Sequence, residues 1–343
     1  MPGDRQNFKG GTKPSAAIAG AGLMGFWHAK NIARAGGELA VVYDVDQSAA
    51  QRLASRFKNT QVVADFEQAL EREKIDVLHI CTPLRSHFEL ASTALSRGVH
   101  VLVEKPMTRH CAETERLYEV AAEHRVLLCP VHQFPFQPGV RKARAEFGRI
   151  GELRHFEATF CSAGGAGRSR EQLDEIVAEI LPHPLSLMQL FAPGSLSEKS
   201  WAVSRPTPGE FRATLTAYDI CFSILISMNS RPTASTLRLL ATAGTIYVDL
   251  FHGFCVIESG RVSRRRKIVR PFDLSSRILF AAGGNLLKRA LRNELAYPGL
   301  RNLIERFYSA VSADSEPPIP PAETIQIAAI CERLVSAASA VAS

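Results

Sequence analysis

Three glycines and one aspartate in the first 44 residues have the spacing of a nucleotide-binding loop. The stretch AIAGAGLMGFWHA places Gly20, Gly22 and Gly25 in the order G-x-G-x-x-G, and Asp44 ends the next apolar segment, LAVVYD. In such a loop the first glycine permits a tight turn, the second lets a pyrophosphate approach the backbone, and the third lets a helix pack closely. The N–H groups at the start of that helix favour phosphate charge. The pattern predicts a dinucleotide site, and a glycine-rich surface turn is the alternative.

Asp44 also indicates which dinucleotide is bound. A carboxylate at this position can accept hydrogen bonds from both ribose hydroxyls of NAD, and it would repel the 2′-phosphate of NADP. No arginine follows Asp44 directly, because the sequence there reads DVDQ. We therefore expect NAD as the cofactor, with NADP less favoured.

Two further segments hold candidates for proton transfer. Lys105 follows the apolar segment VHVLVE, and His183 lies between Pro182 and Pro184 in EILPHPLSLMQLF. A lysine at the carboxyl end of a parallel strand faces the crevice where such sheets bind ligands. The two prolines are tolerated only in the first turn of a helix, so we expect His183 at a helix start. The alternatives are a salt bridge between Lys105 and Glu104, and a packing histidine bonded to a backbone carbonyl.

The elements that must position these residues alternate in the first half of the chain. Apolar segments typical of buried strands lie at 15–19, 39–44, 77–82 and 99–104, with helical apolar spacing between them. This alternation predicts a parallel sheet covered on both faces, which is a Rossmann arrangement. After about residue 150, strand-like segments such as ELRHFEATF and CFSILISMN follow one another with few helices, which predicts a largely antiparallel sheet.

The predicted fold class is therefore α/β, with two domains. A disordered leader covers residues 1–13, and a Rossmann NAD-binding domain covers residues 14–134. An α+β domain with a large, mostly antiparallel open sheet covers residues 135–343, and it would serve in substrate binding and oligomerisation. The helices at the end of this second domain are able to pack back on the first.

The composition is that of a globular protein without metal or membrane segments. Of the 343 residues, 46% are hydrophobic and 22% are charged. The seven cysteines are scattered without a C-x-x-C pair, which argues against a disulfide framework or a zinc cluster, and we expect no metal. The N-terminus has no apolar signal region, and polar residues interrupt every long apolar run. We therefore expect a cytoplasmic protein.

Positive charge gathers late in the chain. The formal net charge is +7, with basic clusters at 261–270 and 288–292. No aromatic interleaving accompanies them, so we expect no nucleic-acid partner. The segment 274–304 has the pattern of an amphipathic helix pair. It would form a dimer contact or cover the substrate cleft, and binding at a lipid surface is the alternative. We expect no membrane partner.

The segment ICTPLRSHFELASTALSRGVHVLVEKPMT at 80–108 resembles the core signature of the glucose–fructose oxidoreductase/inositol dehydrogenase/MocA family, abbreviated Gfo/Idh/MocA. The resemblance lies in Thr82-Pro83, in His87 and in Glu104-Lys105-Pro106. The segments GRIGELRHFEAT, LLATAGTIYVDL and FYSAVSADSEPPIPPAETIQIAAICE also resemble the start of the family's second domain, its late strand pair and its last helices. The resemblance therefore covers most of residues 14–340.

The resemblance implies a two-domain nicotinamide oxidoreductase. In such a protein Thr82, Pro83 and His87 line the cofactor, Glu104 lies beside the nicotinamide, and Lys105 reaches the reacting hydroxyl or carbonyl. With the glycine loop, the full set of expected cofactor contacts is Gly20, Gly22, Leu23, Met24, Gly25, Asp44, Thr82, Pro83, His87, Glu104, Lys105 and Pro106.

Two departures from the family pattern concern the substrate site. Relatives usually carry an aspartate, a histidine four residues later and an aspartate three residues beyond, where this chain has Glu179, His183 and Ser186. The resemblance implies that His183 is an acid/base and that Glu179 contacts substrate or orients His183, since residues at i and i+4 share a helix face. His132 precedes Gln133 where relatives often have arginine, and it is either a substrate contact or a buried hinge histidine.

The function implied is hydride transfer between a secondary alcohol or ketone and NAD. The substrate would be a small-molecule sugar, nucleotide-sugar or cyclitol-like polyol, with Lys105 and His183 handling the hydroxyl proton. A homo-oligomer, a dimer or tetramer through the C-terminal sheet, is expected. Two alternatives stay open. One is a redox-neutral epimerase or glycosidase with tightly bound NAD, and the other is a non-catalytic ligand-sensing protein of the same fold.

Overall fold

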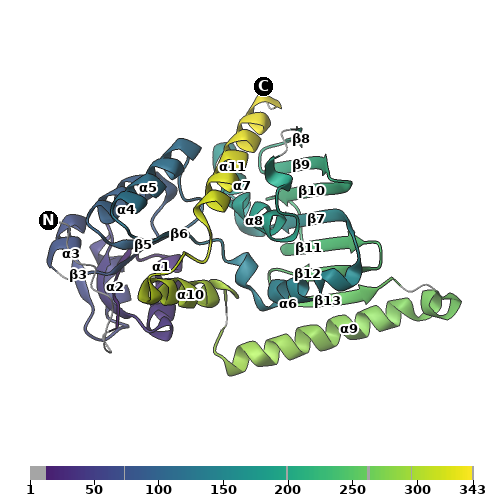
Figure 1. Cartoon of the computed structure of the whole chain (residues 1–343), viewed down its shortest axis with the longest axis horizontal. Helices are drawn as coiled ribbons and strands as arrows, with labels where there is room; N and C mark the ends of the chain where they lie inside the picture. Colours follow the sequence, from purple (N-terminus) through teal and green to yellow (C-terminus); the bar gives the residue numbers. More distant parts are fainter. Residues whose placement is uncertain (1–12, 73, 198–199, 261–262, 295, 342–343) are drawn as a thin grey trace. The chain divides into compact units, whose positions relative to one another are not determined.

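The computed structural model describes residues 13–72, 74–197, 200–260, 263–294 and 296–341, so most of the expected leader lies outside the described residues. It divides into two compact units (Figure 1). The first unit holds the chain up to His132 together with Leu300–Ala329, and the second holds Gln133–Gly299 together with Ile330–Ser343. The chain thus leaves the first unit after His132 and returns to it for residues 300–329.

The first unit is built on a parallel sheet with strand order β3-β2-β1-β4-β5-β6. Strands β4 and β5 are covered on both faces, because successive side chains such as Leu78, Ile80, Val101 and Leu102 are all buried. Figure 1 shows α4 and α5 on one face of this sheet and α1 and α10 on the other. The predicted Rossmann arrangement is confirmed. Its strands are β1 (Ser15–Ala19), β2 (Glu38–Tyr43), β3 (Gln61–Val63), β4 (Val77–Ile80), β5 (His100–Val103) and β6 (Leu128–Pro130).

Helices connect most of these parallel strands. A central group of apolar side chains from α4 and α5 packs with strand residues in one core. The helices of this unit are α1 (Leu23–Ile32), α2 (Gln47–Ala54), α3 (Phe66–Arg72), α4 (His87–Ser96), α5 (Cys111–Glu123) and α10 (Leu300–Ala313), with 3₁₀ turns at Ala33–Ala35 and Leu84–Ser86.

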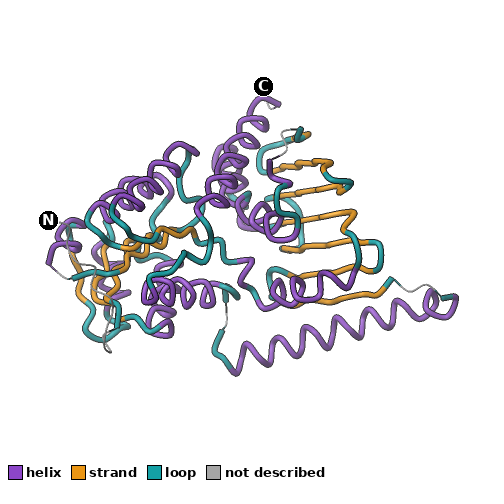
Figure 2. Tube along the Cα trace, viewed as in Figure 1, coloured by secondary structure: helices purple, strands orange, loops and turns teal. Residues whose placement is uncertain are grey.

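The second unit is built on a mixed sheet with strand order β13-β12-β11-β7-β10-β9-β8. Among the strand pairs that the structure describes here, β7–β10 is parallel and the others are antiparallel. The mostly antiparallel second sheet is therefore confirmed, and Figure 2 shows its strands as one layer. Its strands are β7 (Leu153–Cys161), β8 (Ala202–Ser204), β9 (Glu210–Ala217), β10 (Ile220–Ser227), β11 (Ala234–Ala241), β12 (Gly244–Asp249) and β13 (Phe254–Ser259).

The helices of the second unit include one unusually long element. This is α9 (Arg264–Leu291), which contains Pro271 and starts ten residues before the segment in which a helix pair is expected. The second helix of that pair is α10, and the break before it contains Pro298 and Gly299, whose φ is +107°. The other helices are α6 (Pro138–Glu146), α7 (Arg170–Ile180) and α8 (Pro182–Phe191), with 3₁₀ turns at Phe134–Phe136, Phe147–Ile150, Ala163–Gly165 and Ser195–Ser197.

The last helix, α11 (Pro321–Val341), runs through residues of both units. Among the described helices it is long and apolar enough, by length and composition alone, to cross a membrane. Its side chains Ile327, Ile330, Leu334 and Ala338 recur every three or four residues and are buried. That burial pattern is typical of an amphipathic helix packed against a protein core.

Candidate active site

The glycine loop connects β1 to α1, and its three glycines are needed for different reasons. Gly20 has a φ of +101°, and a Cβ there would lie 2.5 Å from the carbonyl carbon of Cys81. A Cβ on Gly25 would lie 2.0 Å from the Gly20 oxygen. A Cβ on Gly22 would meet nothing within 4 Å, and no described side chain caps the start of α1 at Leu23. The loop therefore has an open hollow beside free N–H groups, which fits a pyrophosphate.

Asp44 lies at the carboxyl end of β2 and holds the loop in place. Its Oδ2 accepts a hydrogen bond from the Ala21 N–H at 2.6 Å, and its Oδ1 accepts one from the Asp46 N–H at 2.8 Å. The Gly20 N–H donates to the Tyr43 oxygen at 2.8 Å. Because each carboxylate oxygen can accept a second hydrogen bond, Asp44 can still receive ribose hydroxyls.

His87 joins the loops that follow β4 and β5. Its Nδ1 lies 2.9 Å from the Pro106 oxygen, and its Nε2 lies 2.8 Å from the Thr82 oxygen. Ser86 adds a hydrogen bond from its Oγ to Oγ1 of Thr82 at 2.8 Å. The Lys105–Pro106 peptide bond is cis. Since both ring nitrogens of His87 face backbone oxygens, this histidine positions the two loops, and a contact of its ring nitrogens with the cofactor would compete with these bonds.

A buried chain of four polar side chains ends at Glu104. Nε2 of His28 lies 3.2 Å from Oε1 of Glu104, and Nδ1 of His28 lies 2.8 Å from Nδ1 of His79. Nε2 of His79 lies 2.9 Å from the Tyr308 hydroxyl. All four side chains are less than 10% exposed. We call this set the Glu104 chain.

One arrangement of protons satisfies every member of the Glu104 chain. If Glu104 is ionised it only accepts, so His28 donates through Nε2 and accepts at Nδ1. His79 must then donate through Nδ1 and accept at Nε2 from the Tyr308 hydroxyl. These tautomers follow from the hydrogen-bond network.

The electrostatics agree with an ionised Glu104. Burial by itself would raise the pKa of Glu104, but the hydrogen bond from His28, with the charge and backbone N–H of Lys105, holds it below its usual range. Burial lowers the pKa of His79 well below its usual range, so His79 is neutral. Glu104 is thus held as a carboxylate next to Lys105.

His132 follows β6 and lies close to the same two residues. It is 3% exposed, and within the described part of the chain its Nδ1 has no hydrogen-bond partner. Burial and the positive charge of Lys105 lower the pKa of His132 to about 4, while Glu104 opposes this shift. A buried ring nitrogen without a partner is costly unless a ligand group reaches it. The position therefore fits a ligand contact better than a plain packing residue.

The first unit therefore gathers expected cofactor residues and the candidate substrate contact His132 at one edge of one sheet. Gly20, Asp44, Thr82, Glu104 and His132 follow the carboxyl ends of β1, β2, β4, β5 and β6. In open parallel sheets this edge, where the strand order reverses, is where ligands bind. The remaining expected cofactor contacts lie beside these residues. Leu23 and Met24 begin α1, directly after the glycine loop, and Pro83 lies in the loop after β4.

The expected substrate-site histidine lies in the second unit. α8 begins at Pro182, as expected, and His183 stands in its first turn with 8% exposure. The imidazole stacks on the Phe134 ring, with centroids 4.3 Å apart and planes at 27°, and lies 6.4 Å from the Phe160 ring. Ser186 donates its Oγ hydrogen to the His183 oxygen at 2.8 Å, so it supports the helix start.

Glu179 is placed differently from His183. It lies in the last turn of α7 and is exposed, whereas His183 is buried. Leu181 between the two helices keeps right-handed helical angles, so the i, i+4 spacing is preserved across the junction. Lys105 and these two residues belong to different units. The catalytic roles of Lys105, His183 and Glu179 stay predictions.

Sequence reasoning identified none of His28, His79 and Tyr308 as site residues. His28 and His79 are 51 residues apart, and His79 and Tyr308 are 229 residues apart. One sign of the Glu104 chain was visible in the sequence. His28 lies on the inner face of α1, the helix that follows the glycine loop. Among the described residues, no group of three or more His, Cys, Asp or Glu side chains could hold a metal ion.

Comparison with known proteins identifies the class. Residues 15–132 match the Gfo/Idh/MocA family, described as an oxidoreductase family with an NAD-binding Rossmann fold. The chain resembles the Gfo/Idh/MocA family through these residues, which are about a third of its length. It is an NAD(P)-dependent oxidoreductase of the sugar and inositol dehydrogenase type.

Individual relatives cover different shares of the chain. The scyllo-inositol 2-dehydrogenase (NADP(+)) IolU of Bacillus subtilis (strain 168) is 24% identical over 228 residues, which are 63% of this chain and 69% of that protein. The dTDP-3,4-didehydro-2,6-dideoxy-alpha-D-glucose 3-reductase of Saccharopolyspora spinosa is 34% identical over 125 residues, which are 36% of this chain and 37% of that protein. The chain thus matches little more than a third of the length of the more identical relative.

Solved structures match over nearly the whole chain. UDP-N-acetylglucosamine 3-dehydrogenase GnnA from Acidithiobacillus ferrooxidans has a TM-score of 0.75 at 20% identity, covering 97% of this chain and 100% of that one. Levoglucosan dehydrogenase in complex with NADH and levoglucosan has a TM-score of 0.78 at 17% identity, covering 96% of this chain and 98% of that one. At these identities the likeness establishes the fold.

Proposed function

We propose that the chain is an NAD-dependent dehydrogenase or reductase acting on a secondary alcohol or ketone of a sugar, nucleotide-sugar or cyclitol. The observation that carries this proposal is the sheet edge of the first unit. There, an open glycine hollow and Asp44 accompany Lys105, an ionised Glu104 and the buried His132. The relatives support the substrate class, because they include dehydrogenases of scyllo-inositol, UDP-N-acetylglucosamine and levoglucosan.

The proposed roles follow from the chemistry of the side chains. When bound, nicotinamide supplies or accepts the hydride. Lys105 would bind the substrate oxygen and transfer its proton, with Glu104 holding the adjacent backbone through the Lys105 N–H at 3.2 Å. The unpartnered Nδ1 of His132 would donate a hydrogen bond to a ligand group or accept one from it. His183 is the second acid/base candidate, and Glu179 a substrate contact.

The cofactor preference rests on Asp44. One relative is a scyllo-inositol 2-dehydrogenase that uses NADP(+), and levoglucosan dehydrogenase is solved with NADH, so the relatives do not decide between the two cofactors. The Asp44 carboxylate would repel a 2′-phosphate, which favours NAD. A cytoplasmic localisation and a homo-oligomer through the second sheet stay predictions.

The first test is a thermal-shift titration with NAD⁺, NADH, NADP⁺ and NADPH, followed by assay at 340 nm with inositols, sugars and UDP-sugars. We expect stabilisation by NAD(H), since a ligand at about 100 times its Kd adds about 2.7 kcal/mol. Lys105→Met should abolish turnover and keep the NAD shift, and the exposed Lys58→Met serves as the matched control. Full turnover by Lys105→Met, or no shift with any cofactor in protein shown to be cofactor-free, would contradict the proposal.

A further inference from the structure

α9 presents an apolar surface to solvent along its whole length. Its large apolar side chains that are 50% to 80% exposed are Ile268, Val269, Phe272, Leu279, Phe280, Leu286, Leu287 and Leu291. Contiguous exposed apolar surface of this kind is rare on globular proteins unless something covers it. We call this set the α9 stripe.

The α9 stripe is one face of the helix. Ile268, Phe272, Leu279 and Leu286 follow one another at spacings of four, seven and seven residues. The remaining four members, from Val269 to Leu291, follow at spacings of eleven, seven and four residues and form the adjacent row. With 3.6 residues per turn, both rows lie on the same side of α9.

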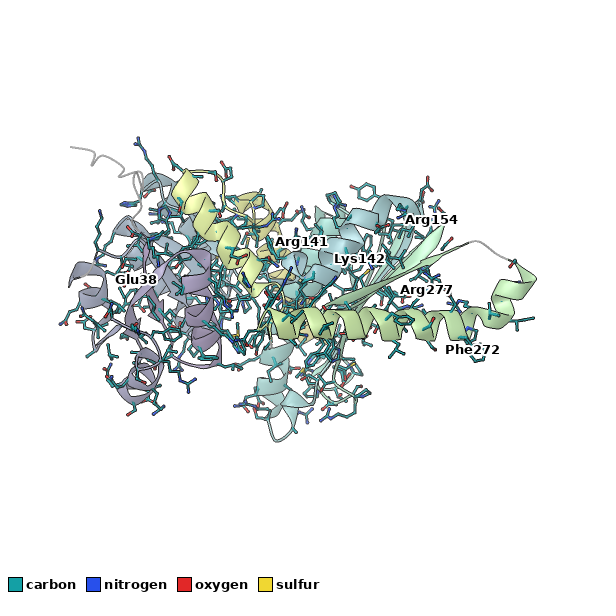
Figure 3. All side chains as sticks on the ribbon, turned by 90° about the horizontal axis from the view of Figure 1, so that it is seen from below. Glu38, Arg141, Lys142, Arg154, Phe272 and Arg277 are labelled. Carbon is teal, nitrogen blue, oxygen red and sulfur yellow. The ribbon has the colours of Figure 1, made fainter. Side chains whose placement is uncertain are left out.

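The opposite side of α9 is attached to the second sheet, so the stripe is held outward. Asn285 and Arg289 both donate to the His252 oxygen, at 2.9 Å and 2.8 Å. Arg270 pairs with Glu258 of β13, with Nη2 and Oε2 3.0 Å apart. Since these contacts fix the rotation of the helix, α9 cannot bury the stripe by turning. Figure 3 looks onto α9 and shows Phe272 on its outer surface.

The charge of α9 indicates what covers the stripe. Eight of its residues are Arg or Lys, and Asp273 is its one acidic residue. α6, which like α9 packs against β13, adds the exposed Arg141 and Lys142, which are labelled in Figure 3. A second copy of the same helix would bring like charges together, which is unfavourable. An anionic surface complements the charge, and a basic amphipathic helix is typical of membrane-surface binding.

We propose that α9 lies on an anionic lipid surface, with the α9 stripe in the boundary between headgroups and acyl chains. The exposed Arg277 and Lys288, at the flank of the stripe, then lie close to the lipid phosphates. This surface is independent of the proposed catalytic function. It departs from the expectation that the chain has no membrane partner, because the sequence did not show that the apolar side of the helix faces solvent.

The test is co-sedimentation of the full chain with vesicles. Vesicles of phosphatidylcholine with about one third phosphatidylglycerol should bind the protein, and pure phosphatidylcholine should bind it much more weakly. Raising the salt concentration should weaken binding, because surface charge is screened within about 8 Å at physiological ionic strength. Equal binding to both vesicle types, or no binding to either, would overturn the proposal.

A triple variant tests the stripe itself. F272S combined with L279S and L286S should reduce binding to anionic vesicles by at least about tenfold, which is 1.4 kcal/mol. The matched control replaces exposed apolar residues elsewhere, V45S with Y218S, and should bind as wild type does. Retained binding by the triple variant would overturn insertion of the stripe. A wild-type dimer that the triple variant dissociates, without vesicle binding by either, would assign the stripe to a second copy instead.

Discussion

The hydrogen bonds assigned to the Glu104 chain can be tested by removing one oxygen atom, the Tyr308 hydroxyl. Tyr308→Phe deletes the hydroxyl that donates to Nε2 of His79 at 2.9 Å, and it keeps the ring. Tyr308 and His79 are 1% and 0% exposed, so no water replaces the lost donor. A buried acceptor left without a partner costs about 1–3 kcal/mol. His28→Leu should cost more, about 3–5 kcal/mol, because it removes the His28 hydrogen bond from the buried Glu104 carboxylate and leaves Nδ1 of His79 without its partner.

Two measurements test this assignment, the free energy of unfolding and the position of the proton on the His79 ring. Urea denaturation at pH 7 gives the free energy of unfolding of Tyr308→Phe, with the exposed Tyr218→Phe as control, for which we expect a change within about 0.5 kcal/mol. Nitrogen-15 spectra of labelled histidine should show His79 protonated at Nδ1 in the wild type. A loss in Tyr308→Phe no larger than that of Tyr218→Phe, with His79 protonated at Nε2 in the wild type, would refute the assigned chain.

Three further predictions concern the sheet edge. Gly22→Ala should fold like the wild type, since a Cβ there meets nothing within 4 Å, yet weaken NAD binding about tenfold or more, and Gly148→Ala is the matched control in fluorescence titrations. Asp44→Asn should raise the affinity for NADP relative to NAD in the same titrations, and an unchanged ratio would contradict the role of its charge. The pKa of His132 is lowered to about 4, so below pH 6.5 the unfolded chain takes up a proton that the native histidine does not. The free energy of unfolding should therefore fall by about 3 kcal/mol between pH 6.5 and pH 4 on account of His132. In His132→Gln, the fall in the free energy of unfolding over the same pH range, measured by denaturation, should be smaller by that amount.

The sequence by itself determined the parts of this protein that depend on near neighbours in the chain. The glycine loop, Asp44 and the strand segments could be predicted because turn geometry, apolar periodicity and strand ends are local properties. The start of α8 at Pro182 was predictable for the same reason, since proline restricts its own backbone and that of its neighbour.

Only the tertiary structure decided which distant side chains meet. The Glu104 chain joins helix α1, strand β4 and helix α10, and no local pattern pairs His79 with a tyrosine 229 residues away. The outward face of α9 was also decided by tertiary contacts. Its apolar and basic periodicity is visible in the sequence, but which side packs depends on the His252 oxygen and Glu258 at the edge of the second sheet. Packing and polar satisfaction act across the fold, so sequence spacing alone does not reveal them.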